Sequence, residues 1–130
     1  MEVNNNENKK LIRILLVDDE EGFVDVLAKR LSRRKFDVTT AYSGGEAIQV
    51  LRRADFDIAV LDLKMEGMDG LEVLKIFKVM APDLPVIILT GHGCLSSAEE
   101  GLKIGAADYI SKPYDFDKLV EKVRLITRKE

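Results

Sequence analysis

The sequence predicts an α/β fold with a single doubly wound domain, in which helices cover both faces of a five-stranded parallel sheet. Five short apolar runs recur along the 130 residues, and a segment with apolar side chains at helical spacing follows each run. Runs that are apolar at nearly every position are typical of strands buried on both faces of a parallel sheet. Because parallel neighbours need crossover connections, the alternation predicts right-handed units of strand, helix and strand.

The first half of the chain contains three predicted strands, at 11–17, 36–41 and 58–61. The strand at 36–41 is more polar than the first, as expected for the edge of a sheet. Ser43, followed by Gly44, predicts the start of a helix, because a serine hydroxyl can accept hydrogen bonds from free backbone N–H groups there. Two helical faces are marked by Val24, Leu27, Ala28 and Leu31, then by Ala47, Ile48 and Leu51.

The second half continues the alternation. Strands are predicted at 86–89 and 107–110. The third helix cannot run far past Pro82, because proline lacks the backbone donor that a helix interior needs. A short fourth helix is predicted to begin at Ser96 or Ser97 and to end at Gly105. The apolar residues that mark the last three helices are Leu71, Leu74 and Phe77, then Ala98 and Leu102, then Phe116, Leu119, Val120, Val123 and Ile126.

The composition fits one globular domain without a strongly charged binding surface. Hydrophobic residues make up 46% of the chain, which supports a buried core. The 20 Lys and Arg residues and 23 Asp and Glu residues give a net charge of -3, so we expect neither direct nucleic-acid binding nor membrane binding. Residues 1–10 are polar and lack a signal-peptide core, and we expect them to form a flexible tail. The single Cys94 can form no internal disulfide, and we expect a cytoplasmic protein.

Four of the five predicted strands end at polar residues that can carry chemistry. Asp18 and Asp19 follow the first strand, and Asp62 ends the third. Thr90 ends the fourth strand, and Lys112 follows the fifth. Because parallel strands place their carboxyl ends at one edge of the sheet, where ligands usually bind, we expect these side chains to converge.

The residue types in this set indicate phosphoryl chemistry with a divalent cation. Carboxylates that crowd together repel each other, and a hard cation bound through their oxygens relieves that repulsion. Mg²⁺ is the expected ion, since it binds through one or two carboxylates together with water and phosphate oxygens. An aspartate such as Asp62 can be the nucleophile in phosphoryl transfer, and the Lys112 ammonium and Thr90 hydroxyl can stabilise the charge that develops.

With these residues in place, the chain resembles the receiver domain of two-component response regulators. The resemblance covers residues 11–128, and its landmarks occur in the family's order. They are Val17-Asp18-Asp19, Leu61-Asp62, Met65, Asp69-Gly70, Thr90-Gly91, Gly105-Ala106-Ala107-Asp108-Tyr109 and Lys112-Pro113. The resemblance implies a sheet of strand order 2-1-3-4-5. It also implies that residues 11–130 form a receiver domain.

The resemblance implies a phosphorylation-activated signalling switch rather than a turnover enzyme. The residue matching Asp62 accepts a phosphoryl group from a histidine kinase or a phosphotransfer protein, and the domain catalyses this transfer and its own slow dephosphorylation. Asp19 and Asp62 would bind Mg²⁺ directly. Asp18 would bind it chiefly through water, and the backbone carbonyl of Lys64 would complete the protein ligands.

The resemblance further implies how the phosphoryl group is sensed. Thr90 and Lys112 would contact its oxygens, Thr90 would move inward, and the side chain of Tyr109 would change rotamer with it. The surface expected to change is formed by the fourth helix, the fifth strand and the last helix, which is also the candidate homodimer surface. The family commonly has a cis peptide bond before the residue matching Pro113.

The chain departs from the family pattern in the loop after Asp62. Many receivers have proline after the residue matching Met65, whereas this chain has Glu66 and Gly67, so we expect a more flexible loop. In the family, the residues matching Lys64 and His92 tune the lifetime of the phosphoryl group. The direction of their effect in this chain is left open by the sequence.

Each candidate residue also has a structural interpretation. Taken alone, Asp19 could cap the following helix, and Asp62 could form a turn. Thr90 alone is an ordinary strand residue, and Tyr109 alone is more often a core residue. A lone His92 is more often an exposed side chain than a metal ligand. The joint occurrence of the acids, the threonine and the lysine favours the functional interpretation.

Three other functions fit parts of the pattern. A flavodoxin-like flavin-binding protein has the same strand order, but the acidic residues 18–21 would repel a flavin phosphate. A phosphohydrolase with an aspartate nucleophile usually carries a second acid two residues later, where this chain has Lys64. The alternative that remains is a phosphorylation-independent, receiver-like module that acts through protein contacts alone.

Overall fold

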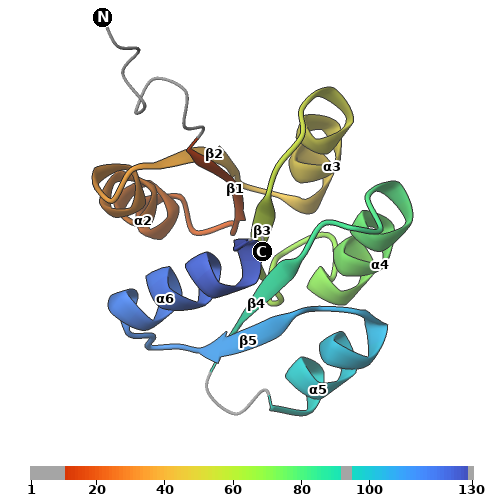
Figure 1. Cartoon of the computed structure of the whole chain (residues 1–130). Helices are drawn as coiled ribbons and strands as arrows, with labels where there is room; N and C mark the ends of the chain where they lie inside the picture. Colours follow the sequence, from red (N-terminus) through yellow and green to blue (C-terminus); the bar gives the residue numbers. More distant parts are fainter. Residues whose placement is uncertain (1–10, 92–94, 129–130) are drawn as a thin grey trace, which may run out of the picture.

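Five parallel strands pair in the order β2-β1-β3-β4-β5, which confirms the order predicted from the sequence (Figure 1). The computed structural model describes residues 11–91 and 95–128. The strands are β1 (Ile12–Val17), β2 (Phe36–Ala41), β3 (Ile58–Asp62), β4 (Val86–Thr90) and β5 (Asp108–Ser111). The more polar β2 lies at one edge of the sheet, as expected. The expected tail at 1–10, His92 and Cys94 lie outside the described residues.

Polar side chains cap the first turn of several helices. The Ser43 hydroxyl accepts a hydrogen bond from the Glu46 N–H at 3.0 Å, and the Glu46 carboxylate accepts one from the Tyr42 N–H at 2.7 Å. The Ser43 bond satisfies a donor that the first helical turn leaves free, and the Glu46 bond ties that turn to the residue before the cap. Asp69 and Asp115 cap the next and last helices in a similar way. The helices are α2 (Glu21–Arg33), α3 (Gly44–Arg53), α4 (Gly70–Met80), α5 (Leu95–Ile104) and α6 (Phe116–Thr127).

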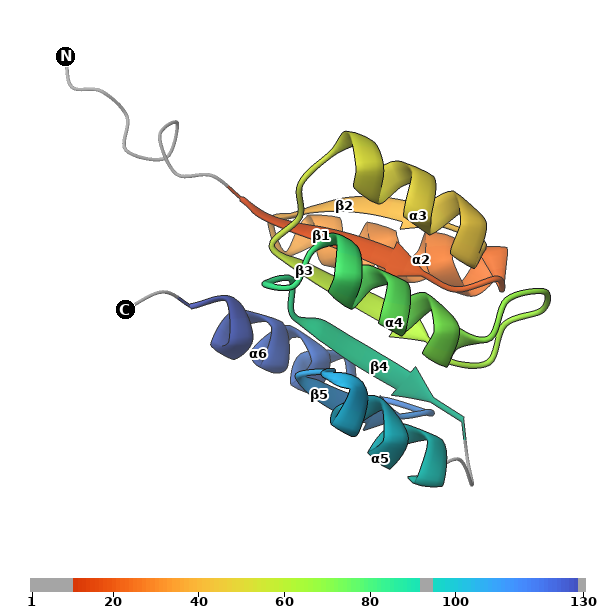
Figure 2. The same ribbon diagram turned by 90° about the vertical axis from the view of Figure 1, so that its right-hand side faces the viewer.

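The sheet separates two hydrophobic clusters, and each is closed by a different set of helices (Figure 2). Leu16 of β1 faces the cluster that contains Leu27 of α2 and Val123 of α6. The next residue back, Leu15, faces the opposite cluster, which contains Phe77 of α4. Because successive strand side chains point to opposite faces, strands that are apolar at every position supply both clusters. Asp18, Asp62 and Thr90 lie where these strands end, at one edge of the sheet.

The fourth predicted helix starts earlier than expected. α5 begins at Leu95, whereas Ser96 or Ser97 was the predicted start. The N–H groups of a first helical turn have no partner within the helix, so a sequence without a strong cap marks the start poorly. The shift moves none of the candidate site residues.

The buried face of α5 also differs from the prediction. Leu102 was expected to face the core, but its side chain is 38% exposed. Ala98 and Gly101 are the buried residues of this helix. A Cβ on Gly101 would overlap with the Cδ1 atom of Ile88, so the glycine lets α5 lie close to β4. The prediction is thus confirmed for Ala98 and wrong for Leu102, because a glycine contributes nothing to an apolar pattern.

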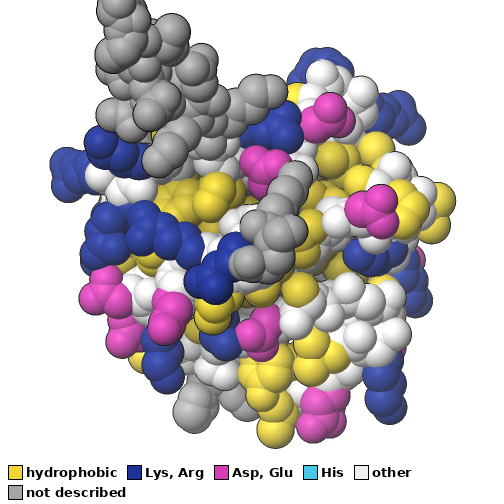
Figure 3. Space-filling model, viewed as in Figure 1, with side chains coloured by type: hydrophobic (Ala, Val, Ile, Leu, Met, Phe, Trp, Pro, Cys, Tyr) yellow, Lys and Arg dark blue, Asp and Glu magenta, His cyan; other side chains and the backbone are white. Residues whose placement is uncertain are grey.

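The edge where the strands begin carries an open cavity but none of the candidate site residues. Figure 3 is viewed onto this edge and shows exposed hydrophobic side chains near its centre, beside Lys and Arg side chains over α2 and α6. The cavity has a volume of about 670 Å³, and Arg13, Phe56, Leu84 and Ile126 are among the residues that line it. Among the described residues, no helix is long and apolar enough to cross a membrane.

A glycine at the start of α4 controls the path of the loop that follows β3, and its replacement tests this packing. A Cβ on Gly70 would lie 2.6 Å from the carbonyl oxygen of Leu63 and would overlap with Leu63 Cα. We expect Gly70→Ala to lower the free energy of unfolding by about 1–3 kcal/mol, because the backbone must shift to accept the methyl group. Urea unfolding would measure the change.

Gly45→Ala is the matched control for this prediction. No heavy atom lies within 4 Å of the position of its Cβ, and Gly45 lies in the first turn of α3. Alanine is a better helix former than glycine, so we expect this variant to be as stable as the wild type or slightly more stable. Equal unfolding midpoints for Gly70→Ala and Gly45→Ala would show that the close approach to Leu63 is not needed.

Candidate functional site

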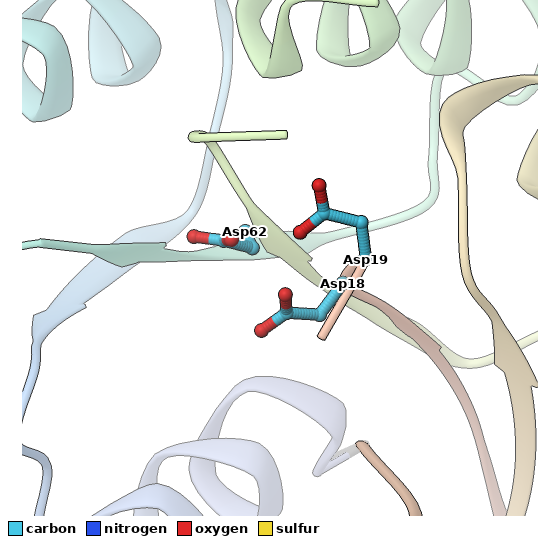
Figure 4. Close-up of side chains that lie close together, drawn as sticks. All are labelled: Asp18, Asp19 and Asp62. Atoms are coloured by element: carbon cyan, nitrogen blue, oxygen red, sulfur yellow. The ribbon is translucent and has the colours of Figure 1, made fainter. Parts of the chain in front are cut away.

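Three carboxylates converge at the edge where the strands end. Asp18 and Asp19 directly follow β1, and Asp62 is the last residue of β3. β1 and β3 pair in parallel with Val17 opposite Leu61, so the next residue of each strand emerges beside the other. One carboxylate oxygen of each acid lies within 4.8 Å of the others (Figure 4). The structure thus brings together residues that are more than forty positions apart in the sequence.

Two of these acids are buried and one is exposed. Asp18 is 0% exposed and Asp62 is 4% exposed, whereas Asp19 is exposed to solvent. Asp18 Oδ1 accepts a hydrogen bond from the Glu20 N–H at 3.1 Å. Glu20, rather than Asp19, occupies the N-cap position of α2, so the interpretation of Asp19 as a helix cap is wrong.

Asp19 instead accepts a hydrogen bond from the loop that follows β3. Its Oδ2 atom accepts a hydrogen bond from the Glu66 N–H at 2.9 Å, across 47 positions of sequence. The same loop contains Gly67 at a φ of +89°, a conformation that favours glycine over other residues. The loop that follows β3 lacks the family's proline, but this hydrogen bond attaches it to Asp19, which follows β1.

Lys112 brings a positive charge to the buried acids. Its Nζ atom lies 3.3 Å from Asp18 Oδ2 and 3.6 Å from Asp62 Oδ1. The side chain is 25% exposed, so this ion pair is partly shielded from water. The ammonium group offsets part of the repulsion between the two carboxylates. The peptide bond between Lys112 and Pro113 is cis, as expected.

Burial, followed by the negative charge of Asp18, raises the pKa of the Asp62 carboxyl to about 6. The Lys112 ammonium and the backbone N–H of Lys64 act in the opposite direction, because both favour the ionised carboxylate. Since the raising influences outweigh the lowering ones, the ionised form of Asp62 is less favourable here than in water. A proton or a cation at this place would relieve the conflict.

Thr90 ends the neighbouring strand β4, but its hydroxyl forms a hydrogen bond with β5. Thr90 is 2% exposed, and the preceding residue Leu89 pairs with Asp62 in the sheet register. Thr90 Oγ1 donates a hydrogen bond to the Ile110 carbonyl oxygen at 3.5 Å, a long distance for a bond from a hydroxyl. Tyr109 is half-buried against the cluster beneath α3 and α4. The phosphoryl-sensing roles of Thr90 and Tyr109 remain predictions, as does a ligand role for the Lys64 carbonyl.

An aromatic residue that the sequence analysis did not identify lies beside Lys112. The Lys112 Nζ atom is 4.8 Å from the centroid of the Phe23 ring. The ring of Tyr114 meets that of Phe23 edge to face, with centroids 5.8 Å apart. The only signal in the sequence is that Phe23 lies in the first turn of the helix that follows the acids, which leaves the direction of its side chain open.

The cavity described above does not lie at this site. The cavity of about 670 Å³ lies at the opposite edge of the sheet, near Arg13 and Asp57. A smaller cavity of about 190 Å³ lies beside the loop that follows β3 and is lined in part by Lys64, Leu71 and Gly91.

Comparison with known proteins agrees with this geometry. The family model described as response regulator receiver domain matches residues 14–124. The transcriptional regulatory protein ZraR of Salmonella typhimurium is 40% identical over 110 residues, which are 85% of this chain and 25% of that protein. A putative response regulator NtrX-like protein of Rickettsia bellii is 39% identical over 112 residues, which are 85% of this chain and 23% of that protein. The chain thus spans about a quarter of the length of these relatives.

Solved structures with the same fold are also similar in sequence. The receiver domain of NtrX from Brucella abortus is 31% identical, with a TM-score of 0.85 over 90% of this chain and 99% of that one. A CheY-like response regulator receiver domain protein from Methanospirillum hungatei is 30% identical, with a TM-score of 0.86 over 91% of this chain and 94% of that one.

The raised pKa of Asp62 predicts that its negative charge destabilises the protein when no divalent cation is present. The folded state holds a proton on Asp62 up to about pH 6, whereas the unfolded chain releases it near pH 4. The wild type therefore loses stability as the pH rises from about 4 to 6. We expect Asp62→Asn to raise the free energy of unfolding by about 1–2 kcal/mol above pH 6, after allowance for solvent screening.

Urea unfolding between pH 4 and pH 8, in buffer with a chelator, would measure this difference. The gain should shrink to nothing near pH 4, where both states of the wild type are protonated at this position. Asp69→Asn is the control, because that residue lies in the exposed loop and either side chain can cap α4. A gain from Asp62→Asn that is the same at every pH would contradict the electrostatic cause.

Proposed function

The chain belongs to the receiver domain family of two-component response regulators, and from this premise we propose that Asp62 accepts a phosphoryl group from a histidine kinase or a phosphotransfer protein. Receiver domains are phosphorylation-activated signalling domains rather than enzymes of metabolic turnover. The observation that carries the proposal for this chain is the convergence of Asp62 with Asp18, Asp19 and Lys112 at one edge of the sheet.

Asp62 is suited to be the nucleophile of this transfer. A carboxylate oxygen of Asp62 would bond to phosphorus while the bond between phosphorus and the donor's leaving atom breaks, which gives an aspartyl phosphate. Only the ionised carboxyl can attack, and the Lys112 ammonium and the Lys64 N–H both favour that form. The Lys112 ammonium, 3.6 Å from Asp62 Oδ1, is also near enough to turn toward a phosphoryl oxygen.

The donor set at this edge fits Mg²⁺. It consists of carboxylate oxygens from three acids within 4.8 Å of one another, which suits a hard divalent cation. We propose that Asp19, Asp62 and the Lys64 carbonyl would bind the ion directly and that Asp18 would bind it chiefly through water. When bound, Mg²⁺ would neutralise charge on the carboxylates and on the incoming phosphoryl oxygens. The hydrogen bond from Glu66 N–H to Asp19 would keep that carboxylate directed toward the site.

Thr90 and Tyr109 are the proposed residues of the conformational response. The Thr90 hydroxyl makes only a long bond to the Ile110 carbonyl, so exchanging it for a bond to a charged phosphoryl oxygen would be favourable. Thr90 and Ile110 lie on adjacent strands, and Tyr109 directly precedes Ile110. A shift of Thr90 would therefore reach the surface formed by α5, β5 and α6. We propose this surface for output and for a homodimer of the phosphorylated chain.

The curated relatives suggest what such an output would serve. ZraR is named a transcriptional regulatory protein, and the chain matches only a quarter of it. We propose that this receiver supplies the phosphorylation-dependent input to a partner or to a further part of a longer regulator. The partner's activity would then depend on the equilibrium between two states of the receiver.

Phosphorylation of Asp62 can be tested with a small phosphodonor. We expect the wild-type chain, incubated with acetyl phosphate and Mg²⁺, to gain the mass of one phosphoryl group in an intact-mass spectrum. Asp62→Asn should gain none, because an amide is not a nucleophile for this reaction. EDTA should abolish the gain in the wild type, since the charge of the donor would then meet uncompensated carboxylates.

Asp69→Asn provides the matched control, because it changes an exposed acid in the same loop and leaves the capping bond of α4 possible. This variant should be phosphorylated as the wild type is. An undiminished adduct on Asp62→Asn, or an adduct that forms equally well in EDTA, would refute the proposal.

A further inference from the structure

The Lys112 ammonium is contacted from two sides. On one side are the carboxylates of Asp18 and Asp62, at 3.3 Å and 3.6 Å. On another is the ring of Phe23, whose centroid lies 4.8 Å from Nζ. This distance is within the range in which a cation is attracted to the negative face of an aromatic ring. An uncharged side chain therefore contacts the lysine in addition to the two carboxylates.

Phe23 is itself held in place. It lies in the first turn of α2 and packs, partly buried, against the hydrophobic cluster between the sheet and the helices α2 and α6. The Tyr114 ring meets it at 87°, edge to face, which is a favourable arrangement for two aromatic rings. Tyr114 follows Lys112 by two residues. The three side chains therefore link the start of α2 to the segment that follows β5.

We propose that Phe23 is a positioning residue that keeps the Lys112 ammonium directed at Asp62. The inference rests on the proposed phosphorylation of Asp62, because it assigns Phe23 an effect on the rate of that reaction. Phe23 itself would touch neither the phosphoryl group nor a metal ion, and its effect would pass through Lys112.

The chemistry of lysine explains why such a residue is useful. The ammonium group lies at the end of a flexible four-carbon chain, so a lysine at the rim of a site can swing into solvent. The side chain here is 25% exposed, which leaves that route open. An aromatic face attracts the cation and limits it to the region beside the acids, whereas a leucine side chain would fill similar space without that attraction. Phosphoryl transfer then begins with the cation already in place, which lowers the barrier.

The test compares two replacements at one position. Phe23→Leu keeps an apolar side chain but removes the aromatic face, and Phe23→Trp keeps an aromatic face. Each is made in the wild-type chain and in Lys112→Ala. The initial rate of phosphorylation by acetyl phosphate with Mg²⁺ is followed by intact mass. The ¹H shifts of the Lys112 ε-methylene group are recorded by NMR without any phosphodonor, since protons over a ring face are shifted upfield.

We expect Phe23→Leu to slow phosphorylation by about three- to tenfold and to remove the upfield shift of the Lys112 methylene protons. Phe23→Trp should restore most of the rate and keep an upfield shift. In the Lys112→Ala chain, Phe23→Leu should cause no further loss of rate, because the contact through which Phe23 acts is already absent. A merely structural role for Phe23 would instead slow the reaction equally in both backgrounds.

Two results would overturn the inference. One is an equal loss of rate from Phe23→Leu with and without Lys112, and the other is a Lys112 methylene shift that Phe23→Leu leaves unchanged. A wild-type chain that takes up no phosphoryl group would refute the proposed function alone. In that case the methylene shift would still decide whether Phe23 holds Lys112.

Discussion

The repulsion between carboxylates at one edge of the sheet is the constraint on which this structure depends. Parallel strands deliver their carboxyl ends to a common edge, so Asp18 and Asp62 must lie side by side. Both are buried, and the partly buried Lys112 ammonium offsets their charge only in part. Burial, and after it the charge of Asp18, gives Asp62 a pKa of about 6, well above the usual range for an aspartate. The fold therefore holds these acids in an arrangement that favours the arrival of positive charge.

Contacts around the acids fix the positions of individual side chains at this edge. The Glu66 N–H directs Asp19 toward the other acids, and the Phe23 ring lies against the lysine that faces them. The long bond of Thr90 to β5 leaves one buried hydroxyl that a stronger acceptor could take over. Membership of the receiver family explains why such an edge exists, and the individual contacts describe how this chain builds it. Under the proposed function, phosphorylation of Asp62 would alter contacts that extend to β5.

The sequence predicted the elements whose signals are repeated along the chain and missed those that depend on a single contact. Apolar runs predicted the strands, and the end of each run predicted which acids would meet. On α5, Ala98 was predicted correctly, but Leu102 was predicted wrongly because Gly101, which carries no apolar side chain, makes the close contact. The bond from Glu66 to Asp19 and the contact of Phe23 with Lys112 depend on loop path and rotamer, which tertiary packing sets. No local pattern encodes them.

The most direct test of the central claim is a pH titration of the Asp62 carboxyl carbon by ¹³C NMR, with and without Mg²⁺. Without Mg²⁺, the midpoint should lie near pH 6, as burial and the neighbouring Asp18 require. Saturating Mg²⁺ should move it below the usual range for an aspartate, because a cation beside the carboxylate favours ionisation. A midpoint near pH 4 that Mg²⁺ does not change would contradict the account.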